Sequence, residues 1–116
     1  MEVRTLAPQL QHVEDAHDVL GLTYRQLAAA LGADESTLHR WRSGESAPRT
    51  IFLSRMDALH EMQQELLDAM GPDAARAWLG AAVPMLDGRR PADLLEQGRI
   101  EPLTRLLIRL NLGTST

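Results

Sequence analysis

The segment from residue 20 to residue 48, LGLTYRQLAAALGADESTLHRWRSGESAP, constrains the fold of this chain more than any other. Thr23 is placed to cap a helix, because Gln26 three residues later can complete a capping box. The helical pattern that follows reaches Leu31, and Gly32 suits the left-handed turn that ends many helices. The segment therefore predicts a short helix that begins after Thr23 and stops at a tight turn.

A second short helix is predicted directly after this turn. Asp34 or Ser36 can cap it, and Ser43 with Gly44 ends it. Apolar side chains of the two helices are spaced to pack against one another, namely Leu27, Ala28, Leu31, Leu38 and Trp41. Two short helices across a glycine turn are typical of a helix-turn-helix.

The rest of the chain also favours helix, because aromatic and β-branched residues are sparse and no stretch alternates like a strand. We predict a first helix over 10–20, which Gly21 ends. A long fourth helix should begin at Pro48 and stop at Gly71–Pro72, where a shorter helix to Leu79 begins. Its core-facing row is Phe52, Met56, Leu59, Met62, Leu66 and Met70.

The last predicted helix has the clearest apolar stripe of the chain. Leu103, Leu106, Leu107 and Leu110 recur at helical spacing and should be buried, and Gly113 should end the helix. The predicted fold class is therefore all-α. An N-terminal helix-turn-helix bundle over residues 1–55 is followed by a second, small helical domain over residues 56–116.

The composition argues against catalysis. The chain has no cysteine, which excludes disulfides, thiolate nucleophiles and sulfur metal ligands. Its four histidines match no metal-ligand spacing and are interpreted as surface imidazoles, and no serine motif or glycine-rich phosphate loop is present. We predict no catalytic residue, metal site or cofactor. The sequence shows no secretory leader and no run of about 18 apolar residues, which predicts a cytoplasmic protein without a membrane segment.

The helix-turn-helix predicts contacts with DNA, because the N-terminal part of its second helix enters the major groove in such units. The residues that this helix would present are Glu35, Ser36, Thr37, His39 and Arg40. The arginines that could contact phosphate are Arg25, Arg42, Arg49 and Arg55. The net charge of -4 and the acids Asp34 and Glu35 at the approaching helix end oppose DNA affinity. A scaffold that does not bind DNA therefore stays open as the alternative.

The second half contains the segment WLGAAVPMLDGRRPADLLEQGRIEPLTRLLIRL. Its pattern is carried by Trp78–Leu79, Pro84, Leu86, Gly88, Arg90–Leu95, Gly98 and the leucine-rich final helix. In these residues the chain resembles the Xre/MbcA/ParS antitoxin family, which joins an Xre-like helix-turn-helix to a toxin-binding domain, and its MbcA-type members in particular. The resemblance covers roughly residues 56–112 and, with the helix-turn-helix, nearly the whole chain.

The resemblance implies that the second half binds a RES-domain toxin that consumes NAD and that the antitoxin's C-terminal end lies over the toxin's active site. Helical spacing places Thr104, Arg105, Ile108 and Arg109 off the leucine stripe. The expected toxin contacts are Arg89, Arg90, Arg105, Ile108, Arg109 and Leu112, with the NLGTST tail. Further expected partners are operator DNA and a second copy of the chain or a larger toxin-antitoxin assembly. The alternative is an Xre-type transcriptional regulator whose second half only dimerises.

Overall fold

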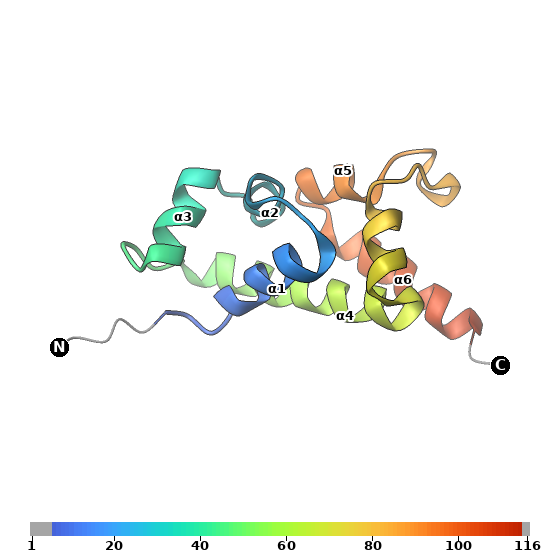
Figure 1. The fold of residues 1–116 in the computed structure, drawn as a ribbon, viewed down its shortest axis with the longest axis horizontal. Helices are drawn as coiled ribbons and strands as arrows, with labels where there is room; N and C mark the ends of the chain where they lie inside the picture. Colours follow the sequence, from blue (N-terminus) through green and yellow to red (C-terminus); the bar gives the residue numbers. More distant parts are fainter. Residues whose placement is uncertain (1–5, 115–116) are drawn as a thin grey trace.

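The computed structural model describes residues 6–114, which form six α-helices and one short 3-10 helix (Figure 1). In chain order they are α1 (Leu10–Leu20), α2 (Tyr24–Leu31), α3 (Glu35–Ser43), α4 (Thr50–Leu79), η1 (Pro84–Leu86), α5 (Pro91–Glu96) and α6 (Ile100–Thr114). Residues 6–114 contain no strand, which confirms the all-α prediction. None of these helices has the length and apolar character that crossing a membrane requires.

The caps of α2 and α3 follow from the sequence. Thr23 Oγ1 accepts a hydrogen bond from the Gln26 amide at 3.0 Å, and the Thr23 amide donates to Gln26 Oε1 at 2.9 Å, which is the predicted capping box. Gly32 has φ +81°, the left-handed conformation that glycine adopts with the least strain. Of the two candidates for the cap of α3, the structure selects Asp34, whose carboxylate accepts from the Thr37 amide at 2.7 Å.

Helix α4 begins later than predicted and is interrupted where predicted. The prediction that Pro48 opens it is wrong, because Arg49 is extended (φ -73°, ψ 163°) and occupies the N-cap position, so that Thr50 is the first helical residue. Gly71 has non-helical angles (φ 78°, ψ 172°), and Pro72 starts the segment that runs to Leu79. The predicted break at Gly71–Pro72 is therefore confirmed as a kink within α4.

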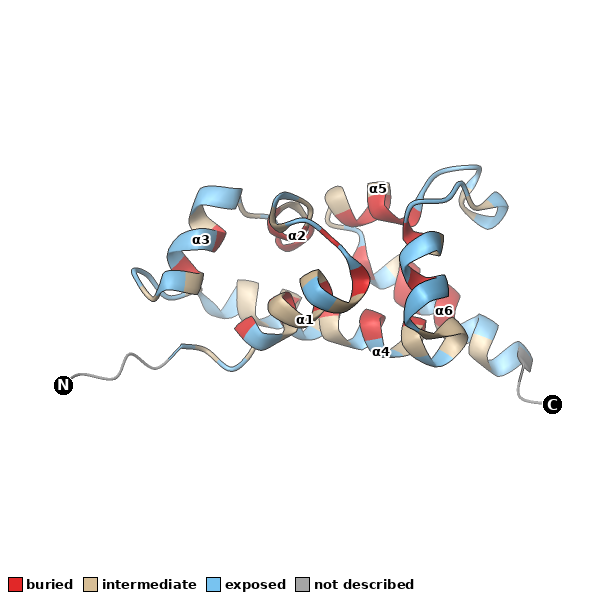
Figure 2. Cartoon of the chain, in the orientation of Figure 1, coloured by how far each residue is buried: buried red, intermediate tan, exposed pale blue. Residues whose placement is uncertain are grey.

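A single hydrophobic core joins the two halves of the chain. Helix α4 packs against both α1 and α6, and α2 packs against α5. The largest fully buried side chains include members from both halves, namely Leu27, Leu31, Leu38, Met56, Leu59, Met62, Leu66, Leu95, Ile100, Leu103 and Leu107 (Figure 2, red). Of the six side chains in the row predicted on α4, four are buried as expected, namely Met56, Leu59, Met62 and Leu66. The predicted domain boundary between residues 55 and 56 falls inside α4, and the division into two domains stays a prediction.

The stripe predicted on α6 is buried over its first three leucines, Leu103, Leu106 and Leu107. The prediction is wrong for Leu110, which is 36% exposed. At the end of α6 the residue that faces α4 is Asn111 instead. Asn111 Nδ2 donates to the backbone carbonyl of Glu65 at 3.1 Å and to its carboxylate at 2.8 Å. A polar pair therefore holds the end of α6 where an apolar contact was expected.

Candidate functional site

The five residues predicted to contact DNA all lie on α3, whose solvent-facing side is the candidate DNA face. Four of them are exposed and one is half-buried, in chain order Glu35, Ser36, Thr37, His39 and Arg40, with Thr37 the half-buried one. Arg40 Nη2 donates to Thr37 Oγ1 at 3.0 Å, and His39 Nε2 lies 3.6 Å from Glu35 Oε2. The structure therefore gathers these side chains on one surface, where contact with DNA stays a prediction.

The N-terminal end of this face is acidic. The backbone amide of Thr37 donates to Asp34 and lowers the pKa of its carboxyl below the ordinary value, so Asp34 is charged at neutral pH. Glu35 adds a second acid in the first turn of α3. Both charges suit the positive end of the helix dipole, but they repel a phosphate backbone. On this face Arg40 is the only arginine among the five candidates, so affinity for DNA depends on few charges.

Two of the four arginines predicted to reach phosphate have partners inside the protein instead. Arg55 Nη2 donates to the carbonyl of Ala30 at 2.9 Å and to that of Gly98 at 2.8 Å. Arg42 forms an ion pair with Glu14. Contact of Arg42 or Arg55 with phosphate stays a prediction, and it would compete with acceptors from distant parts of the chain that already bind N–H groups of both side chains.

The other two arginines remain at the surface. Arg49 is exposed at the start of α4. Arg25 is 68% exposed and lies 3.2 Å from a carboxylate oxygen of Glu96, which links α2 to α5 by an ion pair. An exposed pair of this kind contributes little to stability, so Arg25 can exchange Glu96 for another anion at low cost.

A polar network that the sequence analysis missed joins α1, α2 and α3. The Glu14 carboxylate accepts from Arg42 Nε at 2.5 Å and from the Tyr24 hydroxyl at 2.8 Å. Arg42 also lies 3.8 Å from the centroid of the Tyr24 ring. The hydrogen bond from Arg42 lowers the pKa of Glu14. The pKa of Tyr24 is raised, mainly by burial and to a smaller extent by the hydrogen bond to Glu14. Glu14 and Arg42 are 28 residues apart, so no local pattern indicates this pair.

The outer face of α6 presents the expected toxin contacts of that helix. Arg105, Arg109 and Leu112 are exposed, and Ile108 is half-buried. Leu112 is 69% exposed, so most of this apolar side chain faces solvent. Thr104, which helical spacing also placed off the leucine stripe, is nevertheless buried: it is 7% exposed, and its hydroxyl donates to the Ile100 carbonyl.

A shallow groove runs beside this face, between α4 and α6. It is lined by Ala58, Glu61, Glu101, Thr104, Arg105 and Ile108. Apolar and charged side chains therefore lie next to each other here, an arrangement that suits contact with another protein.

The expected contacts Arg89 and Arg90 lie in a different place, in the loop between η1 and α5. Both are exposed, and Arg90 donates to the carboxylate of Asp93 at 2.8 and 3.1 Å. Figure 1 shows this loop at the top of the view and the end of α6 at the bottom. The structure therefore does not bring all six expected toxin contacts together, and it divides them between the loop and α6.

The histidines are more engaged than predicted. His12 stacks on His60 with 4.1 Å between ring centroids, and His17 stacks on Tyr24 at 4.0 Å. These three histidines are half-buried, so the interpretation as surface imidazoles fits His39 alone. Within residues 6–114 no group of three His, Cys, Asp or Glu side chains is placed to hold a metal ion.

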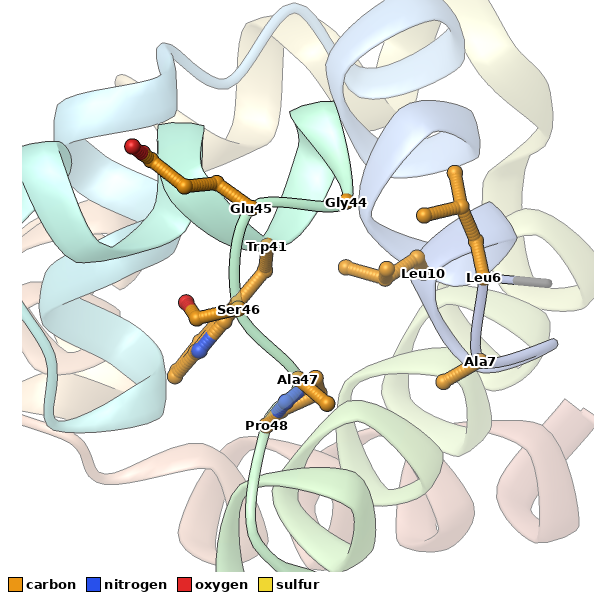
Figure 3. Close-up of a pocket in the computed structure, with 9 residues that line it drawn as sticks. All are labelled: Leu6, Ala7, Leu10, Trp41, Gly44, Glu45, Ser46, Ala47 and Pro48. Atoms are coloured by element: carbon orange, nitrogen blue, oxygen red, sulfur yellow. The ribbon is translucent and has the colours of Figure 1, made fainter. Parts of the chain in front are cut away.

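A pocket lies between the start of α1, the end of α3 and the loop after α3 (Figure 3). Apolar side chains dominate its lining, including Leu6, Leu10 and Trp41. Glu45 is the titratable residue among the nine that line it, and Figure 3 shows its carboxylate pointing away. The pocket therefore has a mainly apolar lining, with Glu45 and Ser46 as its polar side chains.

The fold and these surfaces define a small all-α protein with exposed faces on α3 and α6. No protein-family model matches the chain. Mycobacterial cidal antitoxin MbcA of Mycobacterium tuberculosis is 27% identical to it over 95 residues, which are 82% of this chain and 84% of that protein, and MbcA of Mycobacterium bovis gives the same values. The probable mycobacterial cidal antitoxin Rv3188 of Mycobacterium tuberculosis is 30% identical over 95 residues, 82% of this chain and 81% of the relative.

The chain belongs to the family of MbcA-type mycobacterial cidal antitoxins, which are not enzymes. A solved structure has the same fold. A chain of the crystal structure of the Mycobacterium tuberculosis MbcT–MbcA toxin–antitoxin complex matches with a TM-score of 0.70 and 24% identity, over 96% of this chain and 100% of that one.

Proposed function

We propose that this chain is the antitoxin of a type II toxin-antitoxin system, which binds a RES-domain, NAD-consuming toxin and neutralises it by occluding the toxin's active site. The antitoxins among its relatives and the fold shared with a chain of the MbcT–MbcA complex support this proposal. The observation that carries it is the outer face of α6, where Arg105, Arg109 and Leu112 are exposed beside Ile108. Arginines suit a cleft that is lined by carboxylates, and an exposed leucine suits an apolar contact.

Co-expression with the toxin encoded beside it tests this proposal. Arg109→Glu reverses one charge on the α6 face and should weaken the complex by about 2 kcal/mol or more, because it leaves an interfacial carboxylate without its partner. Arg99→Glu makes the same charge change before α6 begins and should protect like the wild type. Truncation after Leu112 separately tests the last residues of the chain.

Circular dichroism first establishes that each variant is folded. If toxicity is then suppressed equally by the wild type, Arg109→Glu and the truncated chain, the α6 face is not the inhibitory element. The loop with Arg89 and Arg90 would be the next candidate. If the wild type itself neither binds nor protects, the Xre-type regulator with a second half that only dimerises is the better description.

The exposed face of α3 supports a second activity, repression of the chain's own promoter. Its five candidates lie together on the outer side of a capped helix, as the recognition helix of a helix-turn-helix requires. Binding should need a dimer and should weaken steeply with salt, because one such unit offers few cationic groups. Arg40→Ala should lower affinity by about 1–3 kcal/mol in a gel-shift titration at fixed salt if Arg40 contacts a base.

A further inference from the structure

Arg42 joins three helices through one guanidinium group. Its Nε donates to Glu14 of α1 at 2.5 Å, and its Nη2 donates to the hydroxyl of Tyr24 of α2 at 2.8 Å. The guanidinium also lies against the Tyr24 ring, 3.8 Å from its centroid. The His17 ring of α1 stacks on the Tyr24 ring with 4.0 Å between the centroids. Because both groups lie about 4 Å from the ring centre, His17 and the Arg42 guanidinium must cover opposite faces of the Tyr24 ring. Arg42 is thereby fixed in position by charge, hydrogen bonds and stacking at once.

The remaining arm of Arg42 reaches the candidate DNA face. Arg42 Nη1 lies 3.2 Å from Nδ1 of His39, the residue one turn before it on α3. A guanidinium can only donate, so His39 Nδ1 must accept and cannot carry a proton. The proton of the neutral imidazole therefore resides on Nε2, the nitrogen 3.6 Å from Glu35 Oε2 on the exposed side of the helix.

We propose that Arg42 is a positioning residue for DNA recognition, and that it holds His39 as an Nε2–H donor for a base edge in the major groove. The inference rests on the proposed binding of DNA. A donor at this position reads the acceptors N7 and O6 of guanine, N7 of adenine or O4 of thymine, and it does not read the amino group of cytosine. His39 becomes a specificity-determining residue, and Arg42 acts through it without touching DNA.

The geometry separates this role from a phosphate contact. Glu14 and Tyr24 already occupy Nε and Nη2 of Arg42, whose side chain is 29% exposed. A phosphate would therefore have to compete with His39 for Nη1, and the fixed orientation of His39 would be lost. Arg49 offers the contrast, since it is exposed at the start of α4 and is free to contribute charge to the backbone of DNA.

The dependence of DNA affinity on salt tests this assignment with matched substitutions. The probe is duplex DNA from directly upstream of the chain's own coding sequence, titrated at several salt concentrations. Arg42→Met should lower affinity by about tenfold and leave the slope of log affinity against log salt unchanged, whereas Arg49→Met should reduce the slope by about one. Arg42→Lys keeps the charge and loses the planar fork, so it should not restore affinity.

A double-mutant cycle identifies the group through which Arg42 acts. His39→Ala should lower affinity and relax the preference at one base pair in the wild-type background, but it should add little in the Arg42→Met background. The nitrogen chemical shifts of the imidazole should show His39 protonated on Nε2 in the wild type and a mixture of tautomers in Arg42→Met. Tyr24→Phe, which removes one hydroxyl with its hydrogen bonds to Glu14 and Arg42, replaces Arg42→Met if that variant is not folded at 25 °C.

A slope reduced by about one in Arg42→Met, rescue by Arg42→Lys, or fully additive losses from Arg42 and His39 would each overturn the inference and leave the DNA-binding proposal standing. A wild-type chain that binds no promoter DNA would overturn both. Neutralisation of the toxin should be unchanged in all these variants, because none of the substitutions lies on α6 or on the loop after η1.

Discussion

Gly98 is the position where the structure predicts the largest cost for the smallest change. It has φ +76° in the connection between α5 and α6, and a methyl group added there would lie 2.9 Å from Nη2 of Arg55. That nitrogen sits at the end of a flexible side chain, but it donates to the carbonyls of Ala30 and Gly98 at 2.9 and 2.8 Å. Moving it away from the methyl group therefore breaks hydrogen bonds that join α2, α4 and the connection between α5 and α6.

The cost of Gly98→Ala has two parts. A side chain in the left-handed region costs about 1 kcal/mol. Displacing Arg55 from charge-assisted hydrogen bonds costs about 1.5–3 kcal/mol more. Gly88→Ala is the matched control, because Gly88 has φ +78° and nothing within 4 Å of the added methyl. We expect a loss of about 3 kcal/mol for Gly98→Ala and about 1 kcal/mol for Gly88→Ala.

Denaturant titrations followed by circular dichroism measure both losses. In an Arg55→Met background, where the bonds are already absent, Gly98→Ala should cost little more than Gly88→Ala does in the wild type. Equal losses from Gly98→Ala and Gly88→Ala in the wild-type chain would refute the role given to Arg55.

Three further predictions concern the core and the half-buried titratable groups. Leu107→Ala should cost about 2–5 kcal/mol because Leu107 is 0% exposed, whereas Leu112→Ala at 69% exposure should change the free energy of unfolding by less than about 0.5 kcal/mol. Arg42 lowers the pKa of Glu14 below its ordinary 4.5, so Glu14 contributes stability above that pH that is lost on acidification, and Glu14→Gln should flatten the acid limb of stability against pH. Burial, followed by the nearby His60, lowers the pKa of His12 below its ordinary 6.5. The stability of the folded state should therefore fall as pH drops below about 6.5, and His12→Phe should remove that dependence in unfolding curves at pH 7.5 and 5.5.

The local features of this fold could be predicted from the sequence because their physical causes are local. The capping box of Thr23 and the left-handed Gly32 depend on residues at most three positions away. The start of α4 was predicted wrongly because a local preference is not a requirement. Proline favours the first turn of a helix, but a helix need not begin at every proline. The choice of Arg49 as the N-cap depends on how the loop after α3 meets α4.

The candidate sites could be predicted in part only. The face of α3 follows from helical spacing, and so do Arg105 and Arg109 on α6. The partners of Arg42 and Arg55 on other elements could not be foreseen, since they lie 18 to 43 residues away and are chosen by packing. Leu110 has the spacing of the leucine stripe but is not buried with it, because Asn111 donates a hydrogen bond from the end of α6 to Glu65 of α4.

Because α4 belongs to both halves of the chain, it sets the relative position of the two candidate surfaces. Its uninterrupted part, residues 50–70, is about 30 Å long, and the helix packs on both α1 and α6. The two proposed binding surfaces, on α3 and on α6, thus lie toward opposite ends of a body 54 Å long (Figure 1). The shared core and the packing of α2 on α5 fix this arrangement as well, so a residue inserted into α4 would disturb the packing of both halves at once.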